Sequence, residues 1–169
     1  MKQALYLFPL RIRYALLLAC ALFALAGCGK SVIAVPDSPT AQTAQRTTAD
    51  AKNAVVRTAR SQIGTPYKSG GQSPGGFDCS GLVTWAYKQH GFQVPRTTSE
   101  QTRLGRKVER AGLQAGDILV FRTSSGLHTG IYSGRGTFIH SPKTGEKVRE
   151  DALNNVYWNK VYREARRVL

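Results

Sequence analysis

The spacing of the apolar residues changes once along this chain, and that change constrains the fold more than any other feature. Between residues 79 and 91 the apolar side chains recur at helical spacing. From residue 115 onward, short β-branched and aromatic runs such as "HTGIYSG" and "TFIHSP" are separated by glycines. Helices followed by an antiparallel sheet make an α+β domain, which is the fold class we expect.

Glycines, prolines and capping residues mark where the expected elements begin and end. They are Gly64-Thr65-Pro66 after a first helix, Asp78 and Gly91 around a second, Thr98 or Ser99 before a short polar helix, and Gly134-Arg135-Gly136 within a hairpin. With a last strand in residues 161–169, these signals predict one folded domain over residues 53–169.

The chain starts with a basic stretch and an uninterrupted apolar run, which is the architecture of an export signal over residues 1–27. The run from Ala15 to Gly27 is shorter than the roughly 20 residues that a spanning helix needs, so a cleaved signal fits better than a permanent anchor. Its end, Leu25-Ala26-Gly27-Cys28, resembles the lipobox of bacterial lipoproteins, whose cysteine becomes the acylated first residue. We therefore expect a lipid on Cys28, with an ordinary signal peptide as the alternative.

Residues 28–52 are rich in Ser, Thr, Ala, Gln and Pro and have no sustained apolar period, so we expect a flexible tether there. A lipid on Cys28 would hold the domain in the periplasm, at a membrane of the cell envelope. The sequence is compatible with anchoring in either the inner or the outer membrane. Gly29 is not the aspartate that retains many lipoproteins at the inner membrane, yet Lys30-Ser31 resembles retention signals used in some bacteria.

Cys79 is the one cysteine left in the expected domain, because Cys20 lies in the signal and Cys28 would carry lipid. No intrachain disulfide can form, although cysteines of exported proteins normally pair. An unpaired cysteine is either a small buried residue or one kept for its reactivity. In the first turn of a helix, unpaired backbone N–H groups favour a thiolate and can hold an oxyanion, so the position suits an activated nucleophile.

Three histidines could serve as the base. His90 falls at a helix end, where we expect solvated capping, whereas His128 begins one strand of the hairpin and His140 ends the other. Pairing of these strands would bring both rings to one sheet edge, with His128 accepting the Cys79 proton and His140 orienting His128. Structural histidines are the alternative. One cysteine and two histidines lack the close-spaced pairs of structural zinc, so we expect no metal site.

Several ordered blocks resemble the NlpC/P60 cysteine peptidases of bacterial cell walls. They are "GTPYKSGGQSPGGFDCSGLVTWAY", "VPRTTSEQ", "LQAGDILVF", "HTGIYSG", "TFIHSP" and "ARRVL". The resemblance implies a papain-like α+β fold with N-terminal helices packed on an antiparallel β-sheet. It also implies that Cys79 is the nucleophile, that His128 is the general base and acid, and that His140 orients His128.

The same resemblance places Tyr67 near the thiol and Asp78 and Ser80 along the cleft. For Tyr67 the alternative is turn packing after Pro66, and for Asp78 it is helix capping.

The reaction that the resemblance implies is hydrolysis of the D-γ-glutamyl–meso-diaminopimelate bond in peptidoglycan stem peptides, with neither a metal nor an organic cofactor. A cysteine amidase or acyltransferase of the same superfamily is one alternative. A catalytically idle lipoprotein that binds the wall as an adaptor is another, but the presence of Cys79, His128 and His140 argues against it.

Basic residues outnumber acidic ones, with 24 Lys and Arg against 10 Asp and Glu, and no block of like charges stands out. Nucleic acid is a poor partner for an exported protein. Stem peptides, membrane leaflets and the sacculus are anionic, so a basic surface would raise the local concentration of substrate. A solvated face that keeps the protein soluble explains the charge equally well.

Overall fold

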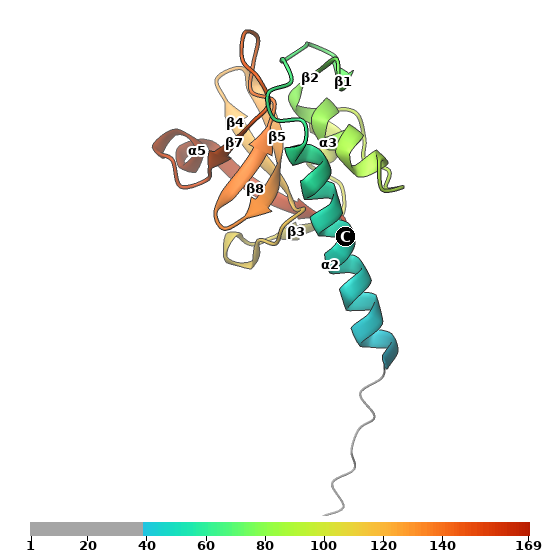
Figure 1. Cartoon of the computed structure of the whole chain (residues 1–169). Coiled ribbons are helices and arrows are strands. Elements are labelled where there is room, and N and C mark those ends of the chain that lie inside the picture. Colours follow the sequence, from blue (N-terminus) through green and yellow to red (C-terminus); the bar gives the residue numbers. More distant parts are fainter. Residues whose placement is uncertain (1–38) are drawn as a thin grey trace, which may run out of the picture. The chain divides into compact units, whose positions relative to one another are not determined.

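The computed structural model describes residues 39–169, and its elements are drawn in Figure 1. The expected signal peptide of residues 1–27 and the expected lipid attachment at Cys28 lie outside the described residues. Within the described part, no helix combines the length and the apolar character that a membrane crossing requires.

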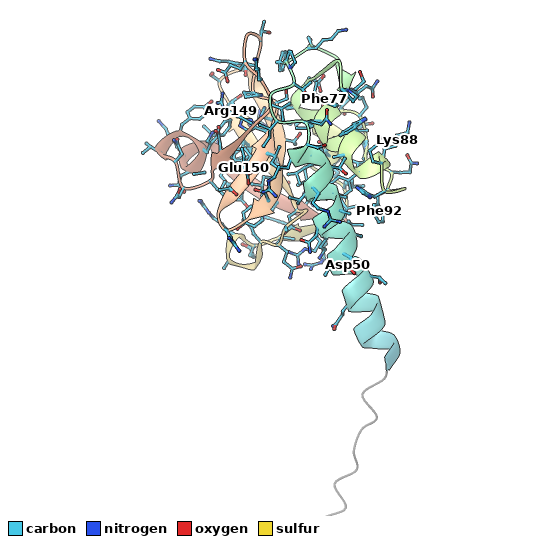
Figure 2. All side chains as sticks on the ribbon, in the orientation of Figure 1. Asp50, Phe77, Lys88, Phe92, Arg149 and Glu150 are labelled. Carbon is cyan, nitrogen blue, oxygen red and sulfur yellow. The ribbon has the colours of Figure 1, made fainter. Side chains whose placement is uncertain are left out.

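The first described element is a long helix, α2 (Pro39–Arg60). It corrects the expectation of a flexible tether over residues 28–52, because the chain is helical from residue 39 onward; residues 28–38 lie outside the described part. Val55, Val56 and Ala59 are buried, whereas Asp50 is exposed on the part of α2 that leads away from the core (Figure 2). The buried residues lie toward the end of α2, where the sequence has its apolar period.

The next helix, α3 (Cys79–Lys88), follows a glycine-rich loop that contains the short antiparallel strands β1 (Gln72–Ser73) and β2 (Gly76–Phe77). Asp78 caps α3 as predicted, with extended backbone and a side chain that accepts the N–H of Gly81. The loop lies tightly against the first turn of α3. A methyl group on Gly81 would sit 2.0 Å from the carbonyl oxygen of Gly71.

The second half of the chain forms a six-stranded antiparallel sheet in the order β3-β8-β4-β5-β6-β7. Its strands are β3 (Arg106–Val108), β4 (Ile118–Thr123), β5 (Gly126–Gly134), β6 (Thr137–His140), β7 (Arg149–Ala152) and β8 (Tyr162–Arg167). The predicted hairpin joins β5 to β6. Arg135 and Gly136 have φ values of 53° and 78°, and a two-residue hairpin turn of type I′ has positive φ at both central residues.

Short helical segments connect the strands. They are α4 (Thr98–Gln101), the 3₁₀ segment η1 (Arg110–Gly112) and α5 (Val156–Val161). The predicted caps of α4, Thr98 or Ser99, were both wrong, because Thr97 caps it and forms a reciprocal capping box with Glu100.

The sheet separates two apolar clusters. On one face, α2 and α3 pack against Ile118, Ile131 and Ile139. On the other face, α5 contributes Trp158 to a cluster that contains Phe121. Figure 1 shows α2 and α3 on one side of the sheet and α5 on the other. The arrangement confirms the predicted α+β class, with N-terminal helices packed on an antiparallel sheet.

We predict that Gly81→Ala destabilises the domain, because the added methyl group would overlap the Gly71 carbonyl oxygen and the backbone would have to shift. The free energy of unfolding, measured by urea titration, should fall by about 1–3 kcal/mol. Gly75→Ala is the matched control, since the nearest atom to a methyl group there is 3.8 Å away. Equal unfolding midpoints for the two variants would contradict the close contact between loop and helix.

Candidate active site

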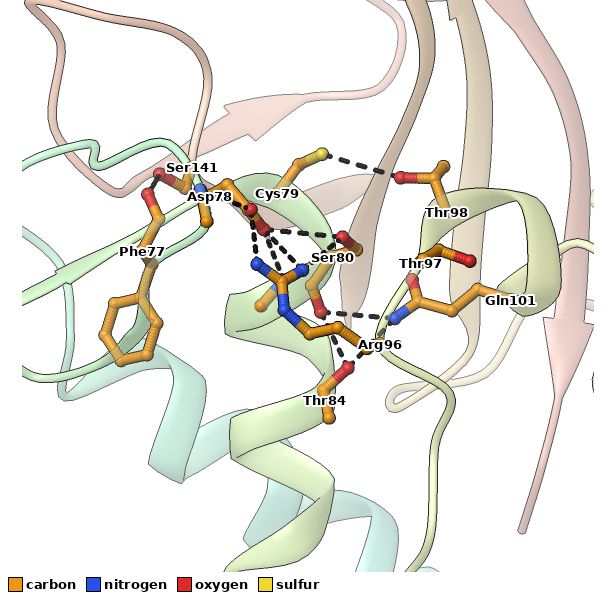
Figure 3. A network of polar contacts seen from close by, with 12 residues as sticks. Phe77, Asp78, Cys79, Ser80, Thr84, Arg96, Thr97, Thr98, Gln101 and Ser141 are labelled. Carbon is orange, nitrogen blue, oxygen red and sulfur yellow. Dashed lines mark hydrogen bonds and ion pairs between the residues drawn. The ribbon is translucent and has the colours of Figure 1, made fainter.

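Cys79 occupies the first position of α3, directly after the Asp78 cap. It is half-buried, and it is the free cysteine of the described residues. Within this part of the chain its Sγ makes one hydrogen bond, to the Thr98 hydroxyl at 3.8 Å (Figure 3). Cys79 and His128 are not hydrogen-bonded to each other here, and such catalytic bonds often close only when substrate binds.

The first turn of α3 presents backbone donors beside the thiol. The Asp78 side chain accepts the N–H of Gly81 at 2.7 Å, and the Asp78 carbonyl oxygen accepts that of Leu82 at 3.1 Å. The N–H groups of Cys79 and Ser80 come earlier in the turn and take part in neither bond. The helix N-terminus therefore offers donors for an oxyanion that forms next to Sγ.

Asp78 and Ser80 support this helix. Arg96 donates to the two Asp78 carboxylate oxygens at 3.0 and 2.5 Å and to the Ser80 hydroxyl at 2.9 Å (Figure 3). Ser80 is only 5% exposed, which leaves little of it for a cleft. The contacts of Asp78 agree with the capping alternative, and direct contact of either residue with substrate stays a prediction.

A buried serine joins β6 to the loop before the nucleophile. Ser141 directly follows His140, and its hydroxyl donates to the carbonyl oxygen of Phe77 at 2.6 Å (Figure 3). Because Phe77 lies two residues before Cys79, this bond ties the end of β6 to the start of α3.

Gln101, the last residue of α4, joins α3 to β5 and is fully buried. Its amide nitrogen donates to the carbonyl oxygen of Ser80 at 3.1 Å, and its amide oxygen accepts from the hydroxyl of Thr129 at 2.9 Å. Ser80 follows Cys79, and Thr129 follows His128. One side chain thus links the residues next to the predicted nucleophile and the predicted base.

The two strand histidines meet, as the hairpin predicted. The Nε2 atom of His128 and the Nδ1 atom of His140 are 2.9 Å apart. The register of β5 and β6 places Gly130 beside His140, which makes His128 a diagonal neighbour on the same face. A Cβ at Gly130 would lie 2.9 Å from the Phe138 ring and 3.1 Å from the His140 Cβ, so the glycine leaves room for the side chains of Phe138 and His140.

Asp151 on β7 extends this pair, and our sequence reasoning missed it. Its Oδ2 atom lies 3.0 Å from His140 Nε2 and 2.9 Å from Trp158 Nε1, and Arg149 Nε donates to the same carboxylate at 3.1 Å. The hydrogen bond from His140, with those from Arg149 and Trp158, holds the pKa of Asp151 well below its usual range. Asp151 is therefore an ionised acceptor at ordinary pH.

The ionised carboxylate assigns the protons on both rings, because it can only accept. Neutral His140 must carry its proton on Nε2 to donate to Asp151, so its Nδ1 accepts a hydrogen bond from the N–H at His128 Nε2. The lone pair of His128 is then on Nδ1. This is the ring nitrogen left to take a proton from Cys79.

Burial keeps the two rings neutral. His128 is 6% exposed, and burial is the main cause that lowers its pKa to about 3, with further contributions from His140 and Arg149. Burial also lowers the pKa of the fully buried His140, against the opposing effect of Asp151. A neutral His128 is the form that can act as a base.

A cavity of about 480 Å³ opens beside His128. Its walls include Ser124, Lys143, Glu146, Arg149, Asp151 and Tyr157. A larger cavity of about 630 Å³ lies between α2 and the turn at Gln114, but its walls carry neither a cysteine nor a histidine. Because His128 and Asp151 line the smaller cavity, we take that cavity as the candidate substrate site.

Tyr67 and His90 lie outside this polar chain. The Tyr67 backbone N–H donates to the Glu146 carbonyl oxygen at 2.8 Å, and within the described residues its hydroxyl has no hydrogen bond. Its place near the thiol stays a prediction. His90 is half-buried, and its Nε2 atom lies 2.8 Å from the Thr58 hydroxyl, so the expected solvated cap was wrong because α2 packs beside it.

The family model of the NlpC/P60 family matches residues 64–167, and the chain belongs to this family. Among curated proteins, it is 44% identical over 121 residues to a probable endopeptidase of Corynebacterium glutamicum (strain R), a match that covers 72% of this chain and 57% of the relative. It is also 40% identical over 122 residues to the murein DD-endopeptidase MepS/murein LD-carboxypeptidase of Escherichia coli (strain K12), covering 71% and 64%.

Among solved structures, the chain resembles an NlpC/P60 family protein from Bacillus cereus ATCC 10987. The TM-score is 0.66 at 35% identity, and the match covers 70% of this chain and 40% of that one. The chain spans between half and two thirds of the length of the two curated relatives.

We predict that Asp151→Asn lowers kcat/KM on a peptidoglycan stem peptide by about 10²–10⁴-fold. An amide nitrogen can donate to His140 Nε2, which would reverse both ring protons and leave an N–H on His128 Nδ1, the nitrogen that must accept the thiol proton. Glu150→Gln is the matched control, because this neighbouring acid pairs with Arg60 instead. If folded Asp151→Asn kept wild-type activity, the carboxylate would not set the tautomer of the base.

Proposed function

We propose that the protein is a peptidoglycan endopeptidase that hydrolyses stem peptides through a cysteine nucleophile. The observation that carries this proposal is the hydrogen-bonded chain of Asp151, His140 and His128, linked through Gln101 to the helix that begins with Cys79. Membership of the NlpC/P60 family supports it, as do the names of the relatives, a probable endopeptidase and a murein DD-endopeptidase.

Sγ of Cys79 attacks the scissile carbonyl carbon while His128 Nδ1 takes the thiol proton. The backbone N–H groups of Cys79 and Ser80 hold the negative charge that develops on the carbonyl oxygen. As the C–N bond breaks, His128 returns its proton to the leaving amine, and a thioester on Cys79 remains. Water then attacks the thioester with His128 as base, which releases a carboxylate and restores the thiol.

The charge of Asp151 matters most while His128 holds the proton. A cation is then present on a ring that is 6% exposed, where water cannot stabilise it well. Asp151 acts on this cation through His140, and the field of its carboxylate is screened little in the buried site. The hydrogen bonds from His128 through His140 to Asp151 therefore orient the base and also stabilise its charged form.

For the scissile bond we propose D-γ-glutamyl–meso-diaminopimelate, as the family resemblance implies. The second candidate is a D,D-cross-link, which the name of the Escherichia coli relative supports. In both bonds an amine of meso-diaminopimelate is the leaving group. An amidase, an acyltransferase and an idle adaptor are the alternatives that product analysis separates.

We predict that digestion of a muropeptide mixture by the purified protein releases fragments that start at diaminopimelate, detected by mass spectrometry. Conversion of cross-linked dimers into intact monomers would identify the D,D-bond instead, and free sugar chains would identify an amidase. Cys79→Ala should form no product and should unfold at nearly the wild-type temperature, because it removes the nucleophile with little loss of packing.

Two reagents serve as controls for this digestion. A thiol alkylator should abolish product formation, and a metal chelator should leave it intact. Chelator-sensitive hydrolysis that persists in Cys79→Ala would contradict the cysteine mechanism.

We further propose that a lipid on Cys28 anchors the protein to an envelope membrane, with the domain in the periplasm. The lipobox-like Leu25-Ala26-Gly27-Cys28 supports this localisation.

We predict that Cys28→Ser moves the protein from the membrane fraction to the soluble fraction, because the acylated residue is lost. Its kcat/KM on dissolved muropeptides should equal that of wild type, since Cys28 precedes the domain that carries the site. Retention of Cys28→Ser in the membrane fraction until detergent is added would show that another segment anchors the chain.

A further inference from the structure

The cavity beside His128 holds hydrogen-bond donors without partners. Lys143 is 76% exposed, and its one ion pair in the described residues is a loose contact of 3.5 Å with Glu146. Arg149 uses Nη1 for Glu146 and Nε for Asp151, while its Nη2 atom has no partner among the described residues. At least two cationic groups thus have donors to spare.

The carboxylates of the same cavity are already engaged. One Glu146 oxygen pairs with Lys143 and the other with Arg149. Both Asp151 oxygens accept from Arg149, and one also accepts from His140 and Trp158. With donors in excess and acceptors in use, the cavity is suited to a ligand that brings a carboxylate.

The residues that line the cavity indicate which part of the substrate binds there. A general acid must lie within hydrogen-bonding distance of the leaving nitrogen, so the leaving residue lies beside His128. His128 lines this cavity and Cys79 does not. The cavity is therefore on the leaving-group side of the scissile bond.

We propose that Lys143 and Arg149 bind a carboxylate of the leaving-group residue and make the enzyme selective for it. This proposal rests on the proposed function, in which meso-diaminopimelate leaves. Its D-centre carboxylate lies on the leaving side in both candidate bonds, whereas a lysine in the same place lacks that group. A volume of about 480 Å³ is in the range of small-molecule sites and accommodates a diamino acid.

The test compares two stem peptides that differ in one group, the D-centre carboxylate of diaminopimelate, which is free in one and amidated in the other. Wild type should cleave the free acid with about tenfold higher kcat/KM. Lys143→Met should remove most of this preference by raising KM for the free acid, with a much smaller change in kcat/KM for the amide. Lys143 is the residue to change because its side chain contacts neither His128 nor Asp151.

Lys147→Met is the matched control, since Lys147 is an exposed lysine of the same loop outside the cavity, and it should keep the wild-type preference. Lys143→Glu should disfavour the free acid further, because it places a like charge beside the carboxylate. Equal cleavage of both peptides by wild type, or an equal loss on both in Lys143→Met, would overturn the carboxylate site and leave the proposed function standing. Cleavage of neither peptide by wild type would overturn both proposals.

Discussion

The buried Gln101 side chain is the constraint on which the catalytic geometry depends. Cys79 belongs to the helical layer and His128 to the sheet, and apolar packing between layers has no preferred direction. Hydrogen bonds do have one, and Gln101 forms them with Ser80 on one side and Thr129 on the other. Loss of this amide would leave buried polar groups unpaired next to both reacting residues, so position and stability depend on the same contacts.

Asp151 determines which of the two histidines donates the hydrogen bond that they share. Two neutral imidazoles can donate either way, and only an acceptor at one end decides which nitrogen of His128 carries the lone pair. The Asp151 side chain is 22% exposed, so water still solvates it in part, while His140 is fully buried. The charge therefore sits where its desolvation cost is modest, and a buried ring transmits its effect to the base.

Local sequence signals were sufficient for part of this site. Cys79 follows a capping residue, and the two-residue turn pairs β5 with β6, so the position of Cys79 and the pairing of the histidine strands were predictable. The register that puts His128 and His140 on one face also depends on an irregularity between Tyr132 and Gly134, which no local signal predicted. Asp151 was not, because an irregular stretch of residues 141–148 precedes its strand, and such a loop does not fix register. Gln101 was missed because it ends a four-residue polar helix, where sequence alone favours exposure and only tertiary packing buries it.

Arg149 connects recognition of the leaving group with the state of the base. Its Nε atom bonds Asp151, its Nη1 atom bonds Glu146, and its Nη2 atom is available to the cavity. A substrate carboxylate can therefore bind Nη2 while Nε keeps its contact with Asp151 and Nη1 its contact with Glu146. The side chain proposed to bind the leaving residue therefore also helps to hold Asp151. Changes at Arg149 would alter both functions together. Lys143, whose one ion pair among the described residues is with Glu146, is the position that separates them.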